Sequence, residues 1–133
     1  MDISMFLEPV SDKCFTANVR PGKNTFGETL TIFRDEEDFP ALEGFQLALV
    51  GVKEERGAVD NHGCADGADY IRKAFYKLFN HWEDLKIVDL GNIKTGKEIS
   101  DDRNTFEHQS VGRHLKAIEL VFLGLFILGK KSC

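Results

Sequence analysis

Two near-continuous apolar runs are the clearest feature of the hydrophobic pattern. Residues 45–52 read FQLALVGV and residues 85–90 read LKIVDL. Neither run alternates strictly between apolar and polar positions, which is typical of strands buried on both faces of a parallel sheet. Gly51 lies near the end of the first run and Gly91 follows the second, where the chain must leave the sheet. The pattern therefore predicts two buried strands.

Between these two runs, the pattern predicts a polar loop followed by a helix. The loop covers residues 53–66, and Asp66 is the candidate N-cap of the helix. Asp69 falls in the first turn, where a negative charge suits the helix dipole. Apolar residues then recur at helical spacing and predict one apolar face, made of Ile71, Ala74, Phe75, Leu78 and Phe79.

The remaining segments complete an α/β pattern. Residues 30–33 predict a short strand within a lead-in that covers residues 1–44. A second helix is predicted from about Thr105. The apolar run at 120–128 fits either a third strand or an extension of that helix, because nearly every position is apolar. Alternating strands and helices predict a single α/β domain with a mainly parallel sheet, in which residues 45–133 follow the lead-in.

The net charge, the length of the apolar runs and the cysteines argue against nucleic-acid and membrane partners. The chain has 133 residues, a net charge of −5 and a sequence pI of about 5.3. An acidic chain lacks the basic field that nucleic acids require, so no nucleic-acid partner is expected. The run at 120–128 is shorter than the roughly 20 apolar residues that span a bilayer, and the N-terminus does not resemble a signal peptide. Three widely separated cysteines fit a reducing compartment, so we expect a cytoplasmic protein without a membrane partner.

Residues 48–92 carry a series of short motifs in a fixed order. The chain reads Gly51-Val52, then Gly63, Gly67 and Ala68, then Ile71-Arg72, and finally Asp89-Leu90-Gly91. This order resembles the opening of the metal-dependent ureohydrolases, the family of arginase, agmatinase and formimidoylglutamase. The letters VKEERG at 52–57, with Met1-Asp2-Ile3 and Glu8-Pro9-Val10, are most similar to a formimidoylglutamase-like branch.

The resemblance implies a fold, a reaction and a cofactor. It implies the N-terminal portion of a three-layer α-β-α fold with a mainly parallel sheet. It also implies hydrolysis of a guanidino or amidino C–N bond in a substrate like formimidoylglutamate or arginine. The complete family member is expected to use a pair of manganese ions, which ionise a bridging water. The family's metal-ligand clusters have no match in this sequence. We therefore expect a truncated chain that has no catalytic or metal-ligating residue, binds no cofactor and is inactive alone.

The loop at 53–66 holds the candidate site residues. It follows a buried strand at its carboxyl end, where open α/β sheets place ligands. In a complete enzyme, the residues predicted to line the substrate entrance are Glu55, Arg56, Asn61 and His62. The alternative interpretation is a solvated turn in which the glycines serve only backbone geometry.

A second function class stays open beside the enzyme. The apolar run at 120–128 and the eleven Phe residues are typical of a non-catalytic α/β module that works by association. In that case a homo-oligomer is the expected form. The letters GLFILGK at 124–130 resemble the start of a phosphate-binding loop, but Lys131 stands where Ser or Thr is required, so nucleotide binding is not expected.

Overall fold

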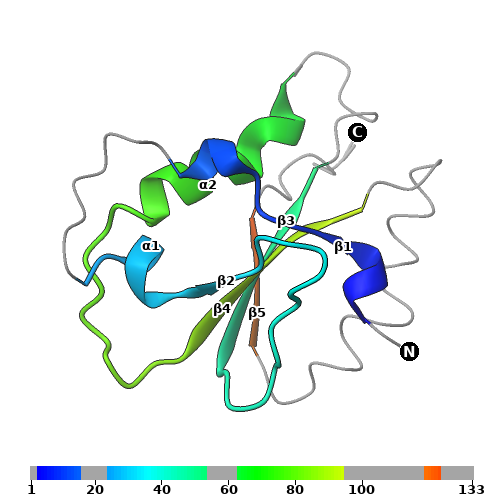
Figure 1. The fold of residues 1–133 in the computed structure, drawn as a ribbon. Coiled ribbons are helices and arrows are strands. Elements are labelled where there is room, and N and C mark those ends of the chain that lie inside the picture. Colours follow the sequence, from blue (N-terminus) through cyan, green and yellow to red (C-terminus); the bar gives the residue numbers. More distant parts are fainter. Residues whose placement is uncertain (1–2, 16–23, 54–62, 95–118, 124–133) are drawn as a thin grey trace, which may run out of the picture.

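The computed structural model describes residues 3–15, 24–53, 63–94 and 119–123 (Figure 1). Its strands form one mixed sheet, in the order β1-β4-β3-β5 with β2 also paired to β4. The predicted α/β fold is therefore confirmed. The strands are β1 (Leu7–Glu8), β2 (Thr31–Ile32), β3 (Leu47–Val52), β4 (Ile87–Ile93) and β5 (Glu119–Leu123).

Three of the four strand pairings among the described residues are parallel. β3 is parallel to both β4 and β5, and β2 is parallel to β4. Only β1 runs antiparallel to its neighbour β4 within the described residues. The predicted strand at 30–33 is thus confirmed as β2, and part of the run at 120–128 forms a strand rather than a helix. The predicted helix from about Thr105 lies outside the described residues.

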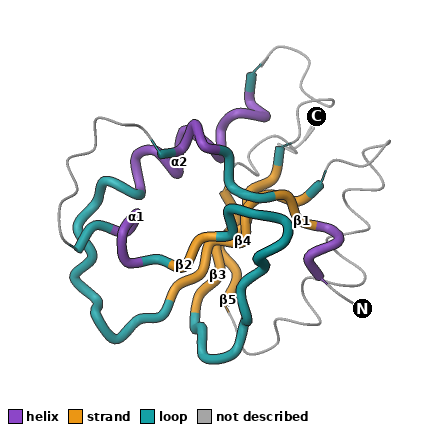
Figure 2. Tube along the Cα trace, viewed as in Figure 1, coloured by secondary structure: helices purple, strands orange, loops and turns teal. Residues whose placement is uncertain are grey.

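Five short helical segments surround the sheet, and α2 is the longest of them among the described residues (Figure 2). α2 lies between β3 and β4 along the chain and covers one face of the sheet, with contacts to β3 and β5. No helix in the described part of the chain is long and apolar enough to cross a membrane. The segments are η1 (Ile3–Phe6), η2 (Asp12–Cys14), α1 (Phe26–Thr29), η3 (Cys64–Asp66) and α2 (Gly67–Phe75).

The two central strands are buried on both faces, as their apolar pattern predicts. Successive side chains of a strand point to opposite faces of the sheet. Ala48 and Val50 of β3 therefore join Phe33 in one cluster, on the face away from α2. Leu49 lies on the other face with Ala68 of α2. The core consequently has two halves, one on each side of the sheet.

The predicted apolar face of α2 is mostly wrong, because Phe75 packs against the core but the other predicted members are exposed. Ile71 is 37% exposed and Leu78 is 56% exposed, and Leu78 already lies beyond the end of the helix. The buried residues of α2 are instead Ala68, Asp69 and Arg72. Buried charges are tolerated only where partners satisfy them. The sheet supplies these partners for Arg72, whereas Asp69 contacts Cys14 of η2 and Arg72 itself.

Candidate functional site

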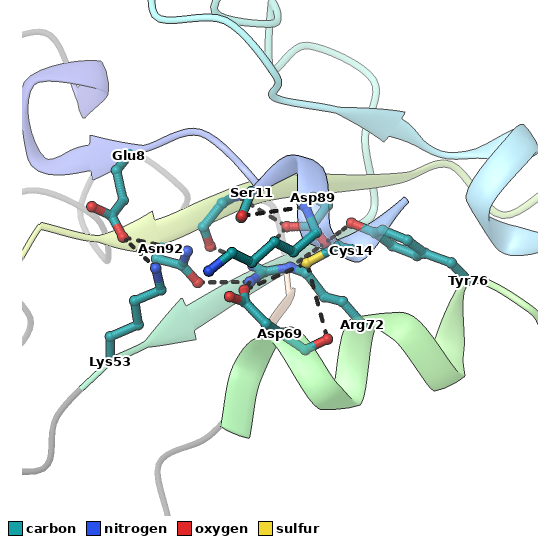
Figure 3. Close-up of polar contacts among 11 residues, drawn as sticks. Glu8, Ser11, Cys14, Lys53, Asp69, Arg72, Tyr76, Asp89 and Asn92 are labelled. Carbon is teal, nitrogen blue, oxygen red and sulfur yellow. Dashed lines mark hydrogen bonds and ion pairs between the residues drawn. The ribbon is translucent and has the colours of Figure 1, made fainter. Parts of the chain in front are cut away.

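Arg72 is the centre of a buried polar network between α2 and β4 (Figure 3). Its guanidinium makes a two-pronged contact with Asp89. The Nε donates to Oδ2 at 2.8 Å and the Nη2 donates to Oδ1 at 2.9 Å. Both side chains have 0% exposure. This fork-to-fork geometry is the strongest form of a carboxylate–arginine pair, so it holds α2 in one position over the sheet.

The rest of the guanidinium and the carboxylate also find partners. Arg72 donates from Nη2 to the Gly91 carbonyl and from Nη1 to Asn92 Oδ1, both at 2.6 Å. Asp89 accepts from the Tyr76 hydroxyl at 2.6 Å and from the Gly91 backbone N–H at 3.0 Å. A buried ion pair is tolerated when its remaining donors and acceptors are satisfied in this way.

A register shift brings Asp89 and Asn92 to the same face of the sheet. Residues three apart in a regular strand point to opposite faces. Here Leu49 pairs with Asp89 and Gly51 pairs with Asn92, so β4 carries one more residue than β3 in this interval. Gly91 lies in the interval with φ +75°, as in a glycine bulge. Sequence analysis placed Gly91 after the strand, which is wrong, because β4 continues to Ile93.

Gly51 leaves the space that this network occupies. A Cβ at this position would overlap Asn92 Oδ1 and would lie 2.9 Å from Arg72 Nη1. A side chain at position 51 would therefore push Asn92 away from the guanidinium. Among the residues that carry the family resemblance, Gly51, Arg72, Asp89 and Gly91 thus all belong to one cluster.

The network reaches the surface at the carboxyl ends of β3 and β4. Asn92 Nδ2 lies 3.5 Å from Glu8 Oε1, and Lys53 Nζ lies 3.2 Å from the same oxygen. The side chains of Lys53 and Glu8 are 29% and 35% exposed, so this pair is partly in contact with solvent. Ligands of open α/β sheets bind at this edge. The cluster therefore positions the edge of the sheet from which residues 54–62 continue.

Burial and charge set the protonation states in the network. Burial by itself would lower the pKa of Arg72. The hydrogen bond and the charge of Asp89 have a larger, opposite effect, so the pKa of Arg72 lies above its usual value. Burial, and then the charge of Asp89, raise the pKa of the Tyr76 hydroxyl above its usual range. Arg72 stays charged and Tyr76 stays neutral at physiological pH, which suits a fixed structural pair better than proton transfer.

Cys14 extends the network on the side of α2. Its Sγ lies 3.5 Å from Asp69 Oδ1, and Asp69 in turn lies 3.8 Å from Arg72 Nη1. Burial and the neighbouring Asp69 carboxylate raise the pKa of the Cys14 thiol from its usual 9.0 to about 11. Because the thiolate is the reactive form, Cys14 is a poor nucleophile near neutral pH.

We expect the stability of the fold to fall at alkaline pH. The folded state holds the Cys14 proton up to a pKa of about 11, against 9.0 for an ordinary thiol. The unfolded state therefore loses its proton first, and stability declines as the pH rises from 9 toward 11. Two pKa units at about 1.4 kcal/mol each give a full loss of about 3 kcal/mol, of which about 2 kcal/mol falls between pH 9 and pH 11. Urea unfolding at a series of pH values measures it.

Two controls isolate the Cys14 contribution. The titration is carried out in a Cys64→Ser/Cys133→Ser background, which removes the other thiols of the chain. A further Cys14→Ala change should make the decline with pH shallower, although Tyr76 still contributes in the same direction. An equally steep decline after Cys14→Ala would contradict the role given to Cys14.

The candidate entrance residues lie outside the described residues. These are Glu55, Arg56, Asn61 and His62. Sequence reasoning missed Tyr76 and Asn92 as members of the buried cluster. A carboxylate flanked by apolar residues, Asp89 in IVDL, is the signal that such a cluster exists, because a buried charge needs a partner.

The described residues do not fit a pair of manganese ions. No group of three or more His, Cys, Asp or Glu residues in this part of the chain is placed to hold a metal ion. The two carboxylates closest to the cluster, Asp69 and Asp89, are already paired with Arg72. No hydrolytic step is therefore assigned to these side chains.

Comparisons with protein-family models, with curated proteins and with solved structures found no match to this chain. The family resemblance consequently stays a prediction that rests on the motifs in residues 48–92.

Proposed function

We propose that this chain forms the N-terminal part of a metal-dependent ureohydrolase. In complete form, that enzyme would hydrolyse a guanidino or amidino C–N bond of a substrate like formimidoylglutamate or arginine. The observation that carries the proposal is the contact between Arg72 and Asp89. These residues come from two motifs of the resemblance, and they meet in a buried two-pronged ion pair.

The position of the loop at 53–66 supports the same assignment. It continues from the carboxyl end of β3 and leads to α2. The polar cluster ties α2 to β4 and occupies the space that Gly51 of β3 leaves. In the proposed enzyme, the cluster holds this edge of the sheet rigid, and Glu55, Arg56, Asn61 and His62 line the substrate entrance. The proposal includes the three-layer α-β-α arrangement of the family and a cytoplasmic location.

The proposal places the manganese ligands in the complete enzyme and assigns none of them to a residue of this chain. Arg72 and Asp89 have a positioning role in it and make no contact with substrate. Their ion pair fixes the strand ends and α2 before substrate arrives, and such preorganisation is what a binding edge requires.

A direct assay tests the proposal. The adjacent downstream coding sequence would be joined to residues 1–133, and urea or formamide release would be measured with manganese present and after chelation. We expect turnover of a guanidino or amidino substrate by the longer form, loss of turnover on chelation, and no turnover by residues 1–133 alone. The dependence on manganese follows from the need to ionise water near neutral pH.

Inactivity of every longer form would contradict the proposal. The second candidate, a non-catalytic module that works by association, would then be favoured. Exposed apolar side chains at Phe79 and Trp82 support this candidate. Its signature in the same preparations would be a mass that rises with concentration in size-exclusion chromatography with light scattering.

A further inference from the structure

An open groove lies at the opposite edge of the sheet, at the amino ends of β3 and β4. It has a volume of about 670 Å³, which falls within the usual size range of small-molecule sites. Residues of the loop between α2 and β4 form most of its wall, and Gln46, which immediately precedes β3, completes it. The lining of the groove includes Phe79, His81, Trp82, Glu83 and Asp84.

Aromatic rings form one side of this groove. Phe79 is 51% exposed and Trp82 is 59% exposed, which leaves much of both rings open to solvent. His81 lies between them, with its ring centroid 4.8 Å from Phe79 and 6.3 Å from Trp82. Large exposed rings that are gathered in one place usually mark a binding surface.

The aromatic wall is anchored to the core. The Trp82 ring lies 6.3 Å from Phe26, which itself stacks on Phe75 of α2 at 4.4 Å. The Trp82 backbone N–H donates to Oδ1 of buried Asn80 at 2.9 Å. This support holds the wall in place without a ligand, so little ordering entropy opposes binding.

Two carboxylates give the groove a negative charge. Glu83 and Asp84 are both exposed, and neither forms an ion pair within the part of the chain that the structure describes. Lys86 lines the adjoining hollow and is not among the residues that line this groove. An anionic ligand would be repelled here, whereas a cation would meet both ring faces and carboxylates.

We propose that this groove is a binding site for a small organic cation that carries an alkylammonium group. The ammonium head lies against the faces of Trp82 and Phe79, and Glu83 and Asp84 supply the opposite charge. Aromatic faces attract ammonium ions through the ring quadrupole, and adjacent carboxylates add to the same attraction. The site is separate from the carboxyl edge assigned to the proposed enzyme, so the two proposals stand or fall independently.

The single tryptophan of the chain provides a specific probe. Trp82 is the only Trp in the sequence, so its indole N–H produces one cross-peak in a nitrogen–proton NMR spectrum. The 133-residue protein would be titrated at low salt with N-acetyl-lysine methylamide. The uncharged comparison ligand is N-acetyl-norleucine methylamide, which keeps the apolar stem. We expect a saturable shift of the indole peak with the lysine compound, and at least a fivefold weaker effect with the norleucine compound.

Paired variants with equal loss of charge test the two carboxylates. Glu83→Gln/Asp84→Asn removes both groove carboxylates, and Glu37→Gln/Asp38→Asn removes two exposed carboxylates from the loop after β2. We expect the first variant to weaken binding of the lysine compound at least fivefold and the second to leave it unchanged. Phe79→Leu independently tests the aromatic side of the groove. Circular dichroism checks that each variant is folded.

Each of four results would overturn the proposal. The first is the absence of a saturable indole shift, and the second is equal binding of the lysine and norleucine compounds. The third is equal binding by the groove variant and the loop variant. Binding of a lysine-containing peptide without binding of the single-residue compound would also overturn it, because the groove would then serve a polypeptide partner and not a small cation.

Discussion

Arg72→Met is expected to lower the free energy of unfolding by about 3–5 kcal/mol, the usual cost of removing one partner from a buried ion pair. The substitution keeps a side chain of similar length, so it leaves little empty space. It does leave the Asp89 carboxylate at 0% exposure with no positive partner, and it removes the donors to Asn92 and to the Gly91 carbonyl. Urea unfolding followed by circular dichroism measures the loss.

The matched control for this change is Lys73→Met. It removes a positive charge from the neighbouring position of α2, where the described contact of the ammonium is with the Tyr70 ring at 5.3 Å. We expect a cost within about 0.5 kcal/mol, as is usual for surface changes. An Arg72→Met cost no larger than that of Lys73→Met would refute the buried-network account.

A double-mutant cycle separates the ion pair from its surroundings. Asp89→Leu alone should also be costly, because it leaves the Arg72 guanidinium buried and unpaired. The combination of Arg72→Met with Asp89→Leu should cost much less than the sum of the two single changes, since no uncompensated charge remains. Some loss should persist in the double variant, because the Tyr76 hydroxyl loses its acceptor.

Gly91→Ala is expected to cost about 3 kcal/mol or more, as the sum of a left-handed backbone penalty and a forced packing change. Gly91 has φ +75°, and a Cβ there would overlap the backbone carbonyl oxygen of Glu8. That oxygen belongs to β1, which is paired with β4, so it cannot move without disturbing the sheet. The unfolding midpoint in urea is the measurement.

Gly44→Ala provides the comparison that isolates the packing effect. Gly44 also has a positive φ, +84°, but a Cβ there would meet no atom within 4 Å. Its expected cost is therefore only the backbone penalty of about 1–2 kcal/mol. Gly91→Ala and Gly44→Ala could instead lower the free energy of unfolding by the same amount. In that case the close approach of β1 to Gly91 would make no contribution to the cost of the substitution.

The local pattern of the sequence predicted the elements of the fold well. The apolar runs at 45–52 and 85–90 correspond to β3 and β4, and the polar loop between them leads into α2. These predictions succeed because burial on both faces of a sheet requires apolar residues at consecutive positions, and that requirement is visible in the sequence itself. The residues of the predicted substrate entrance, Glu55 among them, stay untested.

The sequence by itself determined the order of strands and helix along the chain. It also shows that Asp89, as a carboxylate in a buried strand, requires a partner. The tertiary structure decided which partner it has, which face of α2 is buried, and how far β4 extends. Arg72 and Asp89 are 17 residues apart, and no local periodicity reports such a contact. Hydrophobic periodicity assigned Ile71 to the buried face of the helix and gave Arg72 no place in it, whereas pairing with Asp89 buries Arg72 and leaves Ile71 partly exposed.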